Sequence, residues 1–195
     1  MVMDAFGIPF EERLITFDFE AGNAQIKAVS PSGRVPLLQH GDLKIWESLA
    51  IIEYVAELYP DAGLWPSDAS MRAIARSISM EMHAGFTALR SACPMSMKRK
   101  PASLDNLPGA VHGDVERISM IWKERLAESG GPFLFGAFSA ADAMYAPVVN
   151  RLDVFALTDD PMLHAYMAQV QSHPSWLKWR DAALQEPWYV AEDEV

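Results

Sequence analysis

The chain has 195 residues, of which half are apolar and 22% are charged, a balance typical of soluble globular proteins. Its net charge of −10 argues against a nucleic-acid-binding surface, because the basic cluster at residues 98–100 is short and precedes a proline. No apolar run approaches the roughly 20 residues that cross a bilayer, and the first residues lack a signal-type core, so we expect a cytoplasmic protein.

The first 60 residues alternate short strand-like runs with helical patterns. The patterns predict strands at 13–17, 35–38 and 43–46, a short helix at 24–29, and a helix at 49–59. Gly41-Asp42 between two apolar runs indicates a hairpin turn, and Pro60 ends the helix before it. This part of the chain is therefore predicted to be a small α/β unit at residues 1–60.

Residues 61–67 are expected to be a linker, with Leu64 and Trp65 docked into a cleft because exposed tryptophan is unfavourable. From Asp68, a plausible N-cap, the pattern is helical to the end of the chain. The predicted helices are 68–92, 111–126, 140–153, 161–172 and 175–186. The predicted third part is an all-helical domain at residues 68–195.

Few residues suggest metal or covalent chemistry. Cys93 is the single cysteine, so no internal disulfide forms, and its neighbour Pro94 favours a small buried filler over a nucleophile. The five histidines lack a second ligand at a zinc-like spacing, and neither a phosphate loop nor a Gly-x-Ser-x-Gly elbow is present. We therefore expect no metal site.

The stretch from Arg34 to Ser48 combines features suited to holding a peptide. Pro36 belongs at a strand edge, and a cis bond before it would let Val35 offer its N–H and C=O to an extended ligand. Ser48 begins a helix whose N–H groups favour a carboxylate, and Glu47 beside it suits an amine. The alternative is a plain hairpin in which Ser48 caps a helix and Glu47 is solvated. The residues alone leave both interpretations open.

The segment SPSGRVPLL…GDLKIWESLAIIEYVAELYP resembles the N-terminal half of a glutathione transferase. That resemblance implies a thioredoxin-like domain, with glutathione as co-substrate held by Val35, Pro36, Glu47 and Ser48, and with Arg34 near its glycyl end. The segment GPFLFGAFSAADAMYAPVV resembles the family's Ser-x-x-Asp motif. We interpret this motif as a capping box that starts a core helix, with no catalytic role.

The family's first domain opens with a strand, a loop and a helix that carry a catalytic Ser, Cys or Tyr. Residues 1–6 of this chain resemble the last turns of that helix, so the catalytic residue is unknown, and Tyr54, Ser30 and Ser32 do not match its position. We expect about 15–25 further N-terminal residues in the natural protein, one short βα unit. We also expect weak or absent conjugation of a chromogenic aryl halide by the 195-residue form.

The resemblance also implies an acceptor site on the helix after the linker, where we assign His83, Phe86 and Arg90 to substrate binding. The implied reaction is attack of the glutathione thiolate on a small electrophile, in a detoxifying homodimer without metal. One alternative is a non-catalytic binding or interaction module of the same fold. Another is a glutathione-dependent isomerase or reductase, for which an upstream cysteine would form a mixed disulfide.

Overall fold

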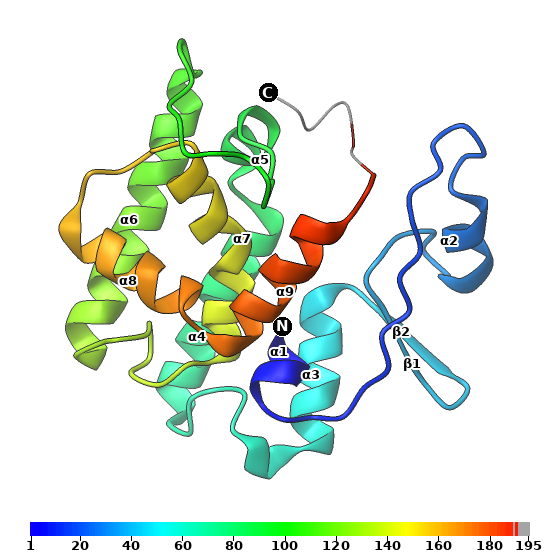
Figure 1. The fold of residues 1–195 in the computed structure, drawn as a ribbon. Coiled ribbons are helices and arrows are strands. Elements are labelled where there is room, and N and C mark those ends of the chain that lie inside the picture. Colours follow the sequence, from blue (N-terminus) through cyan, green and yellow to red (C-terminus); the bar gives the residue numbers. More distant parts are fainter. Residues whose placement is uncertain (189, 191–195) are drawn as a thin grey trace.

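In the computed structural model, which describes residues 1–188 and 190, a small unit with one sheet lies beside a larger bundle of helices (Figure 1). The end of the predicted helical domain, at residues 189 and 191–195, lies outside the described residues. The predicted fold class, an α/β unit followed by an all-helical unit, is confirmed.

The N-terminal unit is built around one hairpin. Gly41 stands at its turn with a φ of 59°, a conformation that glycine adopts without strain. The two strands pair antiparallel, Leu37 opposite Trp46 and His40 opposite Leu43. The elements of this unit are α1 (Val2–Ala5), α2 (Ala24–Val29), β1 (Leu37–His40), β2 (Leu43–Trp46) and α3 (Ser48–Leu58).

The predicted strand at 13–17 is wrong. This segment belongs to no strand, and the side chains of Leu14 and Phe17 are more than half exposed. A strand requires a neighbour to complete its hydrogen-bond ladder, and no described segment pairs with residues 13–17. Local β-propensity alone does not make a strand.

The predicted linker passes through a short 3-10 turn, η1 (Pro60–Ala62), and then buries Leu64 and Trp65 as expected. Ala140 donates its N–H to the carbonyl of Leu64, which ties the linker to the bundle. Glu53 on α3 accepts a two-pronged hydrogen bond from Arg76 in the next helix. These contacts fix the N-terminal unit against the helices.

The bundle begins as predicted with Asp68, which caps the next helix by accepting the Met71 N–H. The single helix predicted at 68–92 is broken into two. Gly85 leaves the helix in an extended conformation, and a Cβ there would stand 2.6 Å from the Glu81 carbonyl oxygen. Phe86 follows with a φ of 53°. The helices of the bundle are α4 (Ala69–Ala84), α5 (Thr87–Ala92), α6 (Gly109–Ser129), α7 (Ala140–Val154), α8 (Pro161–Gln171) and α9 (Pro174–Gln185).

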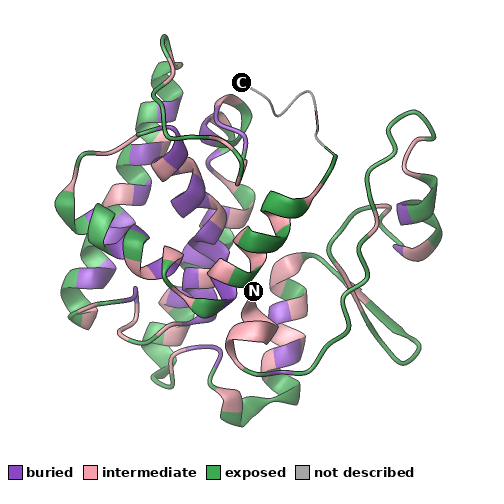
Figure 2. Ribbon diagram, viewed as in Figure 1, coloured by how far each residue is buried: buried purple, intermediate pink, exposed green. Residues whose placement is uncertain are grey.

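The core lies mainly in the bundle, where α7 is buried on nearly all sides (Figure 2). The ring of Trp122 on α6 packs edge-on against Tyr145 and Tyr166, with centroids 5.7 and 4.7 Å away. At the start of α7, Ser139 and Asp142 form the predicted capping box. Within the described part of the chain, no helix is long and apolar enough to cross a membrane.

Candidate functional site

The backbone before β1 presents an unpaired peptide group. The Val35–Pro36 bond is cis, as the sequence suggested, and β1 begins only at Leu37. Val35 is 47% exposed. No group of the described residues accepts its N–H or donates to its carbonyl. This peptide unit is therefore available to an extended ligand.

The N-terminus of α3 lies directly after β2 and has no side-chain cap among the described residues. Ser48 is the first helical residue, and Glu47 occupies the N-cap position. The first N–H groups of an α-helix have no partner within the helix, and the helix dipole favours an anion beside them. The end of α3 thus offers donors to a carboxylate.

Glu47 adopts a backbone conformation that is rare for a residue with a side chain, with φ 69° and ψ 125°. Residues held in such regions cost about 1–3 kcal/mol and concentrate at functional sites. The Glu47 carboxylate lies 3.3 Å from Nε2 of His83 on α4, so the two units meet at this residue. Arg90 on α5 donates to the carbonyl of His83.

A small apolar cavity of about 190 Å³ adjoins these groups. Pro36 and Ser48 both line it, together with Ile51 and Val55 from α3 and Phe10 from the segment after α1. The structure therefore places Pro36, which precedes β1, and Ser48, which begins α3, on the wall of one hollow.

The remaining predicted site residues differ in how far they are buried. Arg34 is exposed on the turn before Val35. Phe86 is only 7% exposed and belongs to the hydrophobic core, so in this structure it supports the break between α4 and α5 and does not form an open wall. His83 is half-buried beside Glu47, and Arg90 is exposed and donates to the carbonyl of His83.

Sequence reasoning missed two features of the site. The positive φ of Glu47 has no local signal, because glycine and asparagine are the residues that ordinarily mark such a position. The contact between Glu47 and His83 joins residues far apart in sequence, and only tertiary packing brings them together.

The described residues contain no group of three or more His, Cys, Asp or Glu side chains that could hold a metal ion. Cys93 is fully buried in the bundle, and this burial raises the pKa of its thiol, which keeps it protonated and unreactive near neutral pH.

The chain combines a thioredoxin-like unit, which has a cis proline near a helix N-terminus, with a helical bundle. This combination defines a class of two-domain proteins. The family description "Glutathione S-transferase, N-terminal domain" matches residues 1–57, and "Glutathione S-transferase, C-terminal domain" matches residues 101–182. Glutathione S-transferase F14 of Arabidopsis thaliana is 34% identical over 88% of this chain and 73% of its own length. The chain belongs to the glutathione S-transferase family.

A second relative supports this assignment, and a solved structure shows the same fold. A glutathione S-transferase of Hyoscyamus muticus is 31% identical over 85% of this chain and 84% of its own length. A solved glutathione transferase homologue from Burkholderia, described with bound glutathione, superposes with a TM-score of 0.71 at 24% identity. The superposition covers 95% of this chain and 89% of that one, and it shows the shared fold.

Proposed function

We propose that the chain binds glutathione between Val35 and the N-terminus of α3 and is a transferase that joins the glutathione sulfur to a small electrophile. The observation that carries the proposal is the uncapped start of α3 beside the unpaired peptide unit of Val35. Relatives named glutathione S-transferase over most of the chain support it.

The carboxylates, the amino group and the central peptide of glutathione each have a suitable partner at this site. Its γ-glutamyl carboxylate suits the free N–H groups of α3 and the Ser48 hydroxyl, because a helix N-terminus favours an anion. Its amino group suits the carboxylate of Glu47, and its central peptide suits Val35. Arg34 is the basic residue nearest in sequence to Val35 and suits the glycyl carboxylate.

The proposed acceptor side lies on α4 and α5. His83 and Arg90 supply donors there for a polar or anionic acceptor, and Phe86 packs in the core nearby. In the reaction, the thiolate donates an electron pair to an electrophilic carbon, a C–S bond forms, and the leaving group departs with its own electron pair. The site's part is to hold both reactants in place. We assign no residue of this chain to activation of the sulfur.

The wider setting is proposed on the same grounds. We propose a cytoplasmic homodimer with a detoxifying role, divided into a glutathione-binding unit at 1–60, a linker at 61–67 and a helical domain at 68–195. Symmetric dimers are the commonest assemblies of soluble proteins. Light scattering coupled to gel filtration should give twice the chain mass of 21.7 kDa. A single-chain mass at micromolar concentration would contradict the dimer.

Calorimetric titration with glutathione tests the site. Ser48→Ala should weaken binding about 2- to 10-fold, because one hydrogen bond contributes about 0.5–1.5 kcal/mol. Ser77→Ala is the matched control, since Ser77 lies on the exposed face of α4 and bonds only within that helix. An unchanged affinity in Ser48→Ala would remove Ser48 from the site.

Turnover is a separate question from binding. A chromogenic aryl halide supplied with glutathione should give a conjugate at a rate above the uncatalysed background if the chain is an enzyme. Tight glutathione binding without any rate above background would favour a binding module of the same fold.

A further inference from the structure

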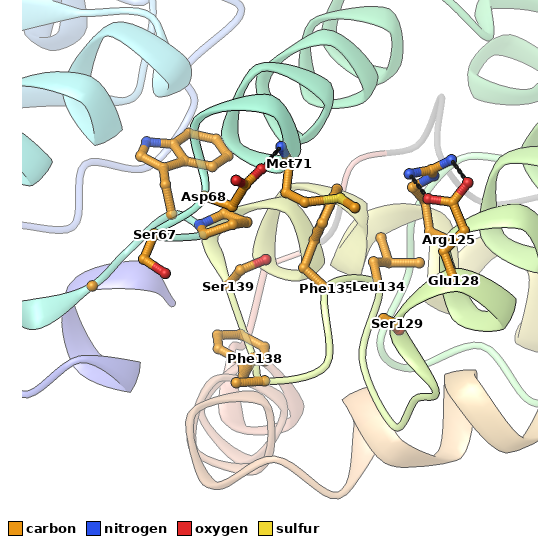
Figure 3. A pocket seen from close by; sticks show the side chains of 14 residues that line it. Ser67, Asp68, Met71, Arg125, Glu128, Ser129, Leu134, Phe135, Phe138 and Ser139 are labelled. Carbon is orange, nitrogen blue, oxygen red and sulfur yellow. Dashed lines mark hydrogen bonds and ion pairs between the residues drawn. The ribbon is translucent and has the colours of Figure 1, made fainter.

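A second cavity, of about 480 Å³, lies at the N-terminal end of α4 (Figure 3). It opens to solvent and is bounded by the linker before α4, the last turns of α6 and the loop at 134–139. Met71 lines it from the first turns of α4, whereas His83 lies near the other end of that helix. At 1.5 Å per residue, about 18 Å of helix separates them. The cavity is therefore distinct from the proposed glutathione site.

The walls of this cavity are mainly aromatic and aliphatic. Cavities of about 300–1,000 Å³ with apolar walls and a few polar groups are typical sites for small ligands. The apolar lining includes Trp65, Met71, Leu134, Phe135 and Phe138. Figure 3 shows Asp68 and Met71 at the top of the view, Phe138 below them, and Arg125 with Glu128 to the right. A planar ring of modest size fits such a wall.

The charged side chains of the lining differ in how far their charge is already paired. Arg125 is only 6% exposed, and its guanidinium donates to both carboxylate oxygens of Glu128, at 2.7 and 2.9 Å, and to Glu124 at 2.6 Å. Its charge is therefore already matched. Of the lining side chains, Asp68 and Glu128 are negative and Arg125 is positive, which leaves the lining with a formal charge of −1.

Three other groups bear on this balance. Arg76 lies over the Trp65 ring, 5.7 Å from its centroid, and its charge is matched by Glu53. Glu124 does not line the cavity but adds a further negative charge behind Arg125. Arg72 also lies outside the lining, and it donates to the carbonyls of Pro66 and Ser67. A carboxylate has about four acceptor positions, so the half-exposed Glu128 keeps acceptor capacity beyond its bonds to Arg125.

We infer that this cavity binds an aromatic compound that carries a protonated amine. The ring would lie among Trp65, Phe135 and Phe138, and the ammonium would face the half-exposed carboxylate of Glu128. An anionic ligand is disfavoured because the one cation of the lining is already paired with two carboxylates. The ligand class thus differs in charge from glutathione, whose net charge is negative.

A matched ligand series tests this inference. The full chain is titrated by calorimetry at pH 7 with 1-naphthylmethylamine, 1-naphthylmethanol and 1-naphthoic acid, which share a ring and differ in charge. The amine should bind about 2- to 5-fold more tightly than the alcohol, and the acid most weakly. Equal affinity across the series, or no binding of the amine at millimolar concentration, would overturn the inference.

Three variants locate the site. Glu128→Gln should bring the amine to the affinity of the alcohol. Glu124→Gln is the control, because it removes a partner of Arg125 without altering the lining. Ala137→Phe fills the cavity from an exposed loop position and should abolish binding of all three ligands, with an unchanged circular dichroism spectrum. If Glu124→Gln weakens the amine as much as Glu128→Gln, or Ala137→Phe leaves binding intact, the cavity is not the site. None of these readouts depends on glutathione.

Discussion

The backbone of Glu47 leads to a prediction that separates binding from stability. Two substitutions, Glu47→Ala and Glu47→Gly, both remove the carboxylate and its contact with His83. They differ only in whether a Cβ remains at a φ of 69°. The difference between the two variants therefore isolates the cost of this conformation.

The magnitude follows from two opposing effects. Relief of a positive φ in a residue with a Cβ contributes about 1–3 kcal/mol. The greater flexibility of glycine in the unfolded chain costs about 0.5–1 kcal/mol. We therefore expect Glu47→Gly to have a free energy of unfolding about 1 kcal/mol higher than that of Glu47→Ala, measured by urea titration.

Glutathione affinity should respond differently. Hydrogen bonds to charged groups contribute about 1.5–3 kcal/mol, and the 49% exposure of the Glu47 side chain reduces this to about 1–2 kcal/mol. Both variants should then bind glutathione about 5- to 30-fold more weakly by calorimetry. One variant, Glu47→Gly, would be the more stable of the two while remaining impaired in binding.

The control lies on the same helix. Glu57 is exposed near the end of α3 with ordinary helical neighbours, so Glu57→Gly should be less stable than Glu57→Ala by about 0.5–1 kcal/mol. The reasoning is refuted if glycine is no better than alanine at position 47. It is also refuted if Glu47→Gly binds glutathione as tightly as the unaltered chain.

The remaining predictions concern the bundle. The buried carboxylate of Asp142 accepts hydrogen bonds from the N–H groups of Leu134 and Ser139 and from the hydroxyls of Ser139 and Tyr166. Asp142→Ala should therefore lower the free energy of unfolding by about 3–5 kcal/mol in urea titration. The control Asp153→Asn, on the same helix, should lower it by less than about 1 kcal/mol. His173 caps α9 by accepting the Ser175 N–H at Nδ1, and burial lowers the pKa of its imidazole. Stability from this neutral imidazole is present above the unfolded pKa near 6.5 and is lost as the pH falls through the lower folded value, as unfolding titrations from pH 7.5 to 5 should show. Cys93 should react with a thiol reagent only after denaturation, because it is fully buried and burial raises its pKa.

Each of these has a result that would contradict it. A small loss in Asp142→Ala, equal to that of Asp153→Asn, would mean that the four bonds do not stabilise the loop before α7. His173→Asn keeps an N-cap acceptor at every pH, so it should flatten the acid dependence, and an unchanged dependence would exclude His173 as its source. Rapid labelling of Cys93 in the native chain would show that the bundle opens readily.

Much of the bundle was predictable because its signals are local. The predicted helices at 140–153, 161–172 and 175–186 lie within a residue or two of α7, α8 and α9. Pro161 and Pro174 stand in the first turns of their helices, where proline needs no hydrogen bond for its nitrogen. Capping residues and apolar spacing are written in consecutive residues, so a single sequence reveals them.

The failures arise where distant segments decide the outcome. The segment 13–17 has the composition of a strand but no described partner, and the apolar stripe of 68–92 continues across a break that Gly85 allows. The proline-serine motif was predictable as a pattern. The contact between Glu47 and His83 and the aromatic cavity at the other end of α4 were not predictable, because both depend on how separate segments pack.

We propose that glutathione lies between Val35 and the start of α3. Titration of the isotope-labelled chain with glutathione, followed by amide NMR, tests it most directly. The account predicts the largest shifts at the amides of Val35, Glu47 and Ser48, with little change at Met71 and Phe135. Shifts centred elsewhere, or none at millimolar glutathione, would contradict it.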